Sequence, residues 1–493
     1  MAQTSKFSHK TWLEQISNSM KTNASVNKDN ETTLCIFAVP ESFVEENPEA
    51  YKPQKLGLGP YHHFRDAVYK SEWDKVATVR SMLNEDHVNQ FNDLVAKKIR
   101  PLYGIVHAFY GNFFDMDADT FSWMFAIDGL FLLSQIYSCN REEFVSDIMM
   151  LENQIPFYVL RELRATFHGF MNHVEDDDWF SNQLIKFCHE IISPLDISKE
   201  AKDCLGCASS SGKHLLDLLY KLIVYNGSTE QGKFERSSGK SKVARIKEIK
   251  ESVRAKFPSC LSFRQGLGHV MFLTRTAIDV ALHLFTRNEE EQAEQDKINS
   301  KEIKIPSVSQ LHDVVNVEFK VSQGGIRSVE FDKEHMTFYL PTINVDENTE
   351  VILRNLVAYE ATMLNSNSIL IFAEYVDLMC GIIDKPRDVA ILRKREIVRA
   401  GNNMDDEEIA KLFNGIKCTT WDRKRKHQLN IALTKVNDRF LNSTKYKVFR
   451  FMKKHVYNSW KFLTLMATIV LLILTGFQSF CDVYGCSDHF FPN

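Results

Sequence analysis

The sequence of 493 residues is poor in the residues that mark tight turns, with 20 glycines and 12 prolines. Phenylalanine is abundant by contrast, at 35 residues. Together these counts favour a helix-rich fold with an aromatic core over a β architecture built from many turns. Apolar residues make up 44% of the chain and charged residues 25%, which excludes a wholly disordered protein.

The chain also lacks an excess of either charge, because its formal net charge is only −4. A value this small for the length predicts no nucleic-acid partner. Any electrostatic recognition must therefore come from local segments.

Local signatures of catalysis are missing as well. The sequence contains no Gly-x-Ser-x-Gly elbow, no complete P-loop, no His-Glu-x-x-His and no Gly-x-Gly-x-x-Gly. It therefore predicts no cofactor and no catalytic residue within a local motif. Catalytic groups can converge from distant positions, so an enzyme stays open as the alternative.

The ten cysteines do not form the two close pairs that are typical of a structural zinc site. Cys204 and Cys207 make a single C-x-x-C, with Cys188, His189 and His214 nearby. One such pair in a serine-rich stretch predicts no metal. Most of the cysteines are expected to be free thiols in a reducing compartment.

No apolar run at the N-terminus has the length of a signal peptide, and residues 1–33 are a polar segment. The one long uncharged run lies at the other end, from Phe462 to Phe480, and covers nineteen residues. As a helix it would be roughly 28 Å long, close to the thickness of a hydrocarbon layer. We therefore predict a single C-terminal transmembrane helix, with residues 457–493 as the anchor and a short non-cytosolic tail.

The flanks of this run predict its orientation. Six Lys or Arg residues lie within the twenty residues before it and none lies after it, which places the body in the cytosol. The protein would then be tail-anchored in the plasma membrane or an endomembrane. Lys453, Lys454 and Lys461 are expected to attract anionic lipid headgroups. Cys481 and Cys486, beyond the run, are either bridged or free.

Residues 34–456 are expected to form one globular domain, with mobile insertions near 226–242 and 287–302. Apolar residues recur at helical spacing in 68–83 and 121–137, among other segments. The segment 121–137 is apolar on nearly every side and predicts a central core helix. A second membrane span is the alternative there, and Asp128 in its middle argues against it.

The period changes after Pro306. Val315, Val317, Phe319 and Val321 alternate with polar residues, which is typical of a half-buried strand, and two further short strands follow. The predicted fold class is therefore mainly α with a small antiparallel β meander (α+β).

Two short segments are candidates for a site. Gly59-Pro60-Tyr61-His62-His63 combines a Gly-Pro turn with two adjacent imidazoles, which could bind a metal or transfer protons. The structural alternative is a tight corner in which one imidazole completes a buried hydrogen bond. The second segment is Leu151-Glu152-Asn153-Gln154-Ile155-Pro156-Phe157, where a helix meets a proline-fixed step and Asn153 can bond main-chain groups.

These segments make the chain resemble the plant-specific family called domain of unknown function 247. Phe64 and Asn316 depart from the family pattern, since glycine is usual at both positions. The likeness runs from about Leu34 to Phe480. Besides the two segments above, the matching strings are Ile36-Phe37-Ala38-Val39-Pro40, Tyr51-Lys52-Pro53, Asp128-Gly129, Ile305-Pro306-Ser307, Asn355-Leu356-Val357-Ala358-Tyr359-Glu360 and Asp388-Val389-Ala390-Ile391-Leu392.

The resemblance implies no established activity, cofactor or substrate. Some grass members resemble determinants of pollen self-incompatibility, which points to recognition, but that role belongs to those members. We therefore expect a membrane-tethered interaction or signalling scaffold with an unidentified protein partner. The alternative is a membrane-proximal enzyme with a non-sequential site near His62 and His63.

Overall fold

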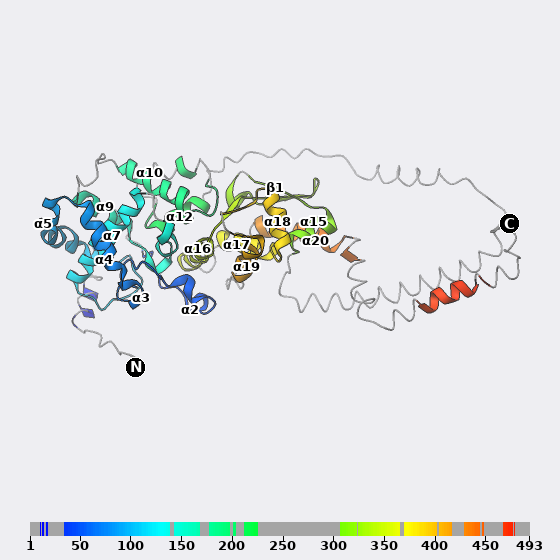
Figure 1. Ribbon diagram of the computed structural model, residues 1–493, viewed down its shortest axis with the longest axis horizontal. Helices are drawn as coiled ribbons and strands as arrows, with labels where there is room; N and C mark the ends of the chain where they lie inside the picture. Colours follow the sequence, from blue (N-terminus) through cyan, green and yellow to red (C-terminus); the bar gives the residue numbers. More distant parts are fainter. Residues whose placement is uncertain are drawn as a thin grey trace. The chain divides into compact units, whose positions relative to one another are not determined.

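The structure is a computed structural model, shown in Figure 1. It describes residues 10, 12–13, 16–17, 34–138, 142–167, 177–197, 201–203, 212–224, 306–322, 324–364, 369–401, 404–416, 428–443, 446–447, 467–476 and 478. The chain divides into two compact units, Met1–Gly227 together with Ile305–Asn493, and Ser228–Lys304. The described residues all lie in the first unit. The predicted insertions near 226–242 and 287–302 lie outside the described residues.

The first half of this unit is helical. Its elements up to the central helix are α2 (Glu41–Val44), η1 (Pro48–Tyr51), α3 (Asp66–Tyr69), α4 (Ser71–Met82), α5 (Glu85–Leu94), η2 (Val95–Ile99), η3 (Arg100–Leu102), α6 (Tyr103–His107) and α7 (Ala118–Ser138). They are followed by η4 (Glu142–Phe144), α8 (Val145–Ile148), η5 (Leu151–Asn153), α9 (Phe157–Thr166), α10 (Asp177–Phe187), η6 (Cys188–Ile192) and α12 (Leu215–Val224).

Helix α7 is the core helix that its apolar sequence predicts. It packs against α4, α9 and η2, which explains why it is apolar on nearly every side (Figure 1). Asp128 lies in its middle and is fully buried within the protein. The alternative of a membrane span in this segment is therefore wrong.

The second half adds two small sheets to further helices. Its elements are α15 (Val308–Val315), β1 (Glu318–Val321), η7 (Gly325–Ser328), β2 (Glu330–Asp332), β3 (Thr337–Leu340), β4 (Ile343–Val345), α16 (Thr349–Met363), α17 (Ile371–Ile382), α18 (Pro386–Lys394), β5 (Val398–Ala400), α19 (Asp406–Gly415) and α20 (Gln428–Leu441).

The predicted antiparallel meander is wrong. The three-stranded sheet has the order β1-β3-β2, with β1 parallel to β3 and β2 antiparallel to β3. The reason lies between β1 and β2, where an antiparallel meander would need a tight turn. Residues 325–328 instead form η7, with Gly325 at φ +66°, so β1 is not followed by a hairpin partner. Strands β4 and β5, which the sequence did not reveal as a pair, form a separate parallel sheet of two strands.

The predicted transmembrane helix between Phe462 and Phe480 is not supported either. Among the described residues, no helix combines the length and the apolar character that crossing a bilayer requires. Residues 467–476 and Gln478 of this run are helical, and the rest of the run lies outside the described residues.

Candidate functional site in the two motif loops

The two predicted segments meet on the buried side of α7. The main-chain N–H of Gly59 donates to Oδ2 of Asp128 over 2.9 Å, and the N–H of Leu58 donates to Oδ1 of Asn153 over 2.6 Å. Pro60 follows at the corner, and the ring of Tyr61 packs edge-on against Phe114, with centroids 5.0 Å apart. Residues far apart in the sequence thus fix the course of one loop.

Gly59 is required by both conformation and space. Its φ is +67°, in the left-handed region that favours glycine. A Cβ there would lie 3.1 Å from the hydroxyl of Tyr110 and 3.3 Å from the carbonyl oxygen of Gln154. The segment Gly59–His63 therefore begins with glycine because its backbone conformation and its close neighbours leave no room for a side chain.

Asn153 and Asp147 act on main-chain groups of the first loop. Asn153 is fully buried, and its Nδ2 donates to the carbonyls of Leu56 and Asp147 over 2.9 and 2.8 Å. The carboxylate of Asp147 accepts main-chain N–H groups from Gln54, Lys55 and Leu56. All of these contacts are internal to the fold.

The other members of the second segment are also used inside the protein. Nε2 of Gln154 donates to the carbonyls of Ile148 and Met150, and the N–H of Leu151 donates to Asn355 over 2.9 Å. Pro156, at φ −60°, directly precedes α9 and fixes its start.

The two adjacent histidines face different carboxylates. Nε2 of His62 lies 2.9 Å from Oε2 of Glu152, within ion-pair distance although the angles are not those of a hydrogen bond. The other carboxylate oxygen of Glu152 accepts the N–H of Val39 over 2.8 Å. Nδ1 of His63 lies 3.7 Å from Oε1 of Glu72. The imidazoles thus join the loop to η5 and to α4, instead of converging on one point.

A buried lysine lies beneath the second histidine. Lys75 of α4 has no exposed surface, and its ammonium donates to the carbonyl of Gly57 over 2.9 Å. It also pairs with the carboxylates of Asp128 and Glu72. Burial disfavours the charged form, but Asp128 and Glu72 outweigh it, so the pKa of Lys75 is raised. The lysine therefore stays protonated.

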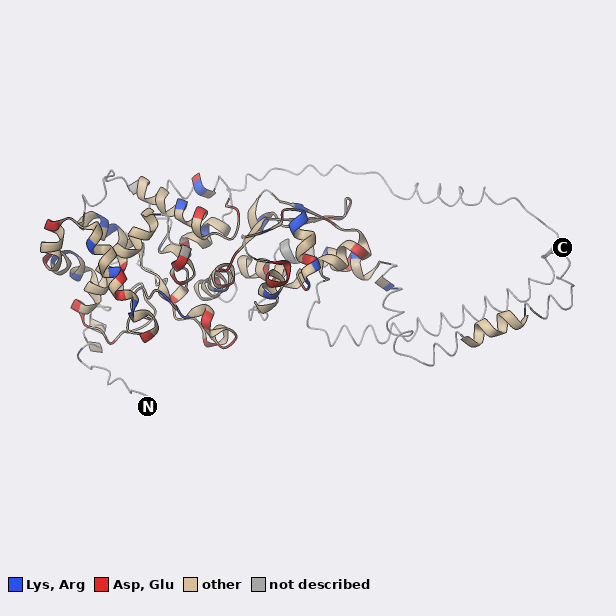
Figure 2. Cartoon of the chain, in the orientation of Figure 1, with Lys and Arg blue, Asp and Glu red and all other residues tan. Residues whose placement is uncertain are grey.

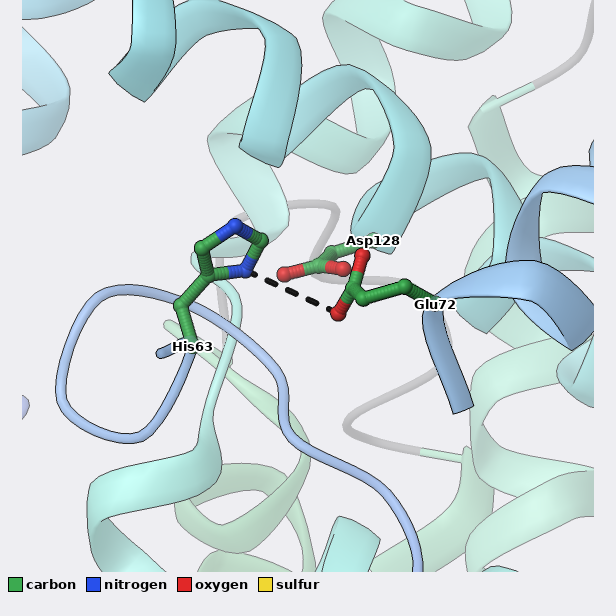
Figure 3. A group of neighbouring side chains, drawn as sticks. All are labelled: His63, Glu72 and Asp128. Carbon is green, nitrogen blue, oxygen red and sulfur yellow. Dashed lines mark ion pairs between the residues drawn. The ribbon is translucent and has the colours of Figure 1, made fainter. Parts of the chain in front are cut away.

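This cluster has the shape of a metal site. One ligand atom each from His63, Glu72 and Asp128 lie within 4.8 Å of one another (Figure 3). The ammonium of Lys75 contacts both carboxylates and already offsets one of their two negative charges. A divalent ion would have to displace a buried cation, so the cluster is better described as an internal ion network.

A second buried network joins α12 to the second half of the unit and includes Tyr359 and Glu360, the last two residues of the matching string 355–360. The hydroxyl of Tyr359 donates to Oδ1 of Asp217 over 2.7 Å, and that of Tyr220 donates to Oε1 of Glu360 over 2.8 Å. Glu360 also accepts main-chain N–H groups from Phe372 and Ala373 at the start of α17. Burial raises the pKa of Glu360, and these donors partly offset it.

The zinc alternative finds no support in this region. His214, one of the residues near the C-x-x-C, uses Nδ1 to accept the N–H of Asp217 and Nε2 to bond the carbonyl of Cys35. Cys188 is a buried free thiol whose pKa is raised by burial. Cys204 and Cys207 lie outside the described residues.

The enzyme alternative calls for a polar pocket shared by His62, His63 and either Glu152 or Glu360. The structure brings His62 to Glu152, but Glu360 belongs to the network around α17. A surface depression is present elsewhere, on α10 and η6, and its lining contains none of these four residues.

The outer face of the first motif region carries a feature that the sequence analysis missed. Four apolar side chains precede or lie on α3 and α4 and are exposed: Phe64 (62%), Tyr69 (58%), Trp73 (81%) and Val76 (41%). The ring of Phe64 packs on His63, with centroids 4.6 Å apart. The signal was available in the helical period, because Trp73 lies opposite the buried positions Lys75 and Val79.

Comparison with known proteins places these features in a family. Residues 36–474 match the profile of DUF247, described as plant protein of unknown function. The UPF0481 protein At3g02645 of Arabidopsis thaliana is 31% identical, over 97% of this chain and 96% of its own. The UPF0481 protein At3g47200 of the same plant is 23% identical, over 91% and 86%. No solved structure matches the chain.

Proposed function

Because this chain belongs to DUF247, a family of plant proteins of unknown function, we propose that it is a recognition scaffold without catalytic chemistry. In this proposal the sequence segments that match the family stabilise the fold, and the outer face of α3 and α4 binds a protein partner. The observation that carries it is the division between the two faces of this region. Polar motif groups point inward to internal partners, whereas large apolar groups point into solvent.

The inward contacts give His62, His63 and Glu152 a structural role without assigning them a reaction. Each imidazole is held by a carboxylate of the same chain, and the amide of Asn153 is used by main-chain groups. Such groups stabilise loops and restrict their motion, which keeps a neighbouring surface in one conformation.

The outward face has the composition of a binding hot spot. Trp and Tyr contribute most to protein interfaces, because they bury a large area at a small cost in side-chain entropy. Trp73, at 81% exposure, has no comparable function in stabilising the isolated chain. Figure 2 shows Lys and Arg interspersed with Asp and Glu over most of the described helices, so no excess of one sign of charge distinguishes this face.

Two earlier expectations remain predictions. Lys453, Lys454 and Lys461 lie outside the described residues, so their binding to anionic lipid headgroups stays to be tested. The same holds for a cytosolic position of the body.

The test of the scaffold is a photo-crosslinking experiment in plant cells, with a photoreactive phenylalanine at position 73 of the full-length chain. We expect one protein to be crosslinked, and the same protein, once purified, to bind the wild-type chain directly. Trp73→Ala should weaken that binding at least tenfold without changing thermal stability. Phe113→Ala, which removes another exposed aromatic ring outside α3 and α4, is the matched control. Equal binding by both variants would contradict the proposal.

A further inference from the structure

The exposed side chains of α3 and α4 lie along one continuous helical face. Lys70, between the two helices, has φ −61° and ψ −29°, so the helical course passes through it. Burial keeps the helical period across this point, since Val68, Ser71, Lys75 and Val79 are the buried positions. The opposite face then carries, in order along the axis, Asp66, Tyr69 with Lys70, Trp73, Val76 with Ala77, and Arg80.

This outer face has an acidic end and a basic end, and its middle carries Tyr69, Trp73 and Val76 together with the exposed Lys70. Asp66 and Arg80 are both exposed, and neither makes an ion pair within the described part of the chain. They are fourteen positions apart, roughly 21 Å along a helix. Trp73 stands midway between them, so the pattern has a centre and two complementary ends.

We propose that this face binds a second copy of the same chain, with the two α3–α4 segments packed antiparallel about a two-fold axis at Trp73. Asp66 then lies opposite Arg80 of the second copy, and Arg80 opposite its Asp66. Tyr69 lies opposite the small Ala77, and the two Trp73 rings meet at the axis. The inference rests on the proposed function, because it names the partner of the same surface.

Symmetry makes the pairing self-consistent. An isologous contact needs a surface that complements itself after a two-fold rotation. A face with an acid at one end and a base at the other meets this requirement only when antiparallel, and antiparallel helices can pack at about 20°. At that angle the ends diverge by only a few ångströms, within the reach of an arginine side chain.

The size of the face sets the expected strength. A stable interface buries about 800 Å² on each partner, and one helix face with the neighbouring Phe64 provides less. The dimer should therefore be weak and reversible, and it should depend on protein concentration in the micromolar range.

Charge reversal tests the pairing in full-length chain purified in a mild detergent, by sedimentation velocity between about 1 and 100 μM. Wild type should pass from monomer to dimer. Asp66→Arg and Arg80→Asp should each raise the protein concentration at which the dimer forms at least tenfold. The reason is that like charges then face each other at both ends. An equimolar mixture of the two variants should recover the dimer, as should the double variant, because each restores opposite charges.

A matched control exchanges the charges of an exposed ion pair elsewhere. Glu407→Lys with Lys411→Glu on α19 reverses the 2.9 Å pair there and should leave dimerisation unchanged. A wild type that is monomeric throughout, or single variants that dimerise like wild type, would overturn the inference. If the chain is monomeric but binds a different protein through Trp73, the self-association fails and the proposed scaffold stands. If Trp73→Ala changes no binding at all, both fail.

Discussion

At the scale of single residues, buried acids and amides of this protein bond mainly to main-chain groups. Asp147 accepts amides of the first motif loop, Glu360 accepts amides at the start of α17, and Asp388 accepts those of Ser309, Asp384 and Lys385. A carboxylate in such a position satisfies donors that would otherwise be buried without a partner. Removing one of these side chains therefore costs more than the bonds that it makes.

Asn153→Ala is the most direct test of this principle. The substitution leaves the N–H of Leu58 and the carbonyls of Leu56 and Asp147 without their partner at a fully buried position. Each unsatisfied group costs about 1–3 kcal/mol, so we expect a loss of roughly 3 kcal/mol or more in the free energy of unfolding. Urea denaturation measures it. Asn112→Ala, at an exposed amide, should cost little, and equal losses for the two variants would contradict the structural role of Asn153.

His214 predicts how stability depends on pH. Burial lowers the pKa of His214 to about 4, with Asp217 opposing the shift. An unfolded histidine titrates near 6.5, so between these values the unfolded chain binds the extra proton and acid favours unfolding. As pH falls from 6.5 to 4, this residue should remove on the order of 3 kcal/mol of stability.

The His214 contribution is measured as the slope of the free energy of unfolding against pH. His214→Gln should have a lower stability at pH 7 but a flatter slope, because its side chain does not titrate. The raised pKa of Glu360 affects the slope with the opposite sign, because above its unfolded pKa the folded chain binds the extra proton. Glu360 is present in both proteins, so its contribution cancels in the comparison. An unchanged slope in the variant would show that His214 is not the titrating group.

At the scale of elements, the contact between α4 and α7 joins the core to the exposed face. Lys75 pairs with Asp128 of α7 on one side of α4, while Trp73 faces solvent on the other. The ion pair therefore fixes the rotation of α4 about its axis. This rotation decides which side chains reach a partner.

A double-mutant cycle measures that ion pair. Lys75→Met should cost about 3–5 kcal/mol, since it leaves Asp128 charged and unpaired in the core. Asp128→Asn keeps an acceptor for Gly59 but loses the charge. The double variant should be more stable than the sum of the single losses predicts, with a coupling energy of at least about 1 kcal/mol. Strict additivity would mean that the two groups do not interact in solution.

Helices were the more predictable elements because their period is local. The expected helix over 68–83 agrees with α4 and the end of α3, and the apolar segment 121–137 lies within α7. The placement of Lys75 was not predictable, because a lysine in a helix is normally solvated and only a distant aspartate explains its burial. The prediction of the strand order was wrong for a similar reason. Val315 ends α15, and β3 lies between β1 and β2 through contacts that no local pattern encodes.

At the scale of the whole molecule, the first unit is assembled from two separated stretches of chain. Asn355 of α16 bonds both Leu151 and Ala50, and Arg327 donates to the carbonyl of Val224 over 2.8 Å. Late in the chain, α20 packs on β2 and α15, with Val436 and Phe440 buried. The sequence motifs revealed that both stretches belong to one family domain, but not that their contact forms a single core.

This assembly predicts that Ser228–Lys304 can be removed. The described core of the first unit draws on residues before 225 and after 305, and its hydrogen bonds across the break join these two stretches directly. The free-energy cost of closing a loop depends only weakly on the length of the loop and rises by about 0.6 kcal/mol for each doubling. Replacing Ser228–Lys304 with a flexible linker of Gly and Ser residues should thus leave the free energy of unfolding within about 1–2 kcal/mol of wild type. Urea denaturation monitored by tryptophan fluorescence measures this value, and Trp73 variants of the shortened chain test partner binding in the same background. A shortened chain that does not fold would show that Ser228–Lys304 contributes to the core, and the boundaries of the domain would then have to include it.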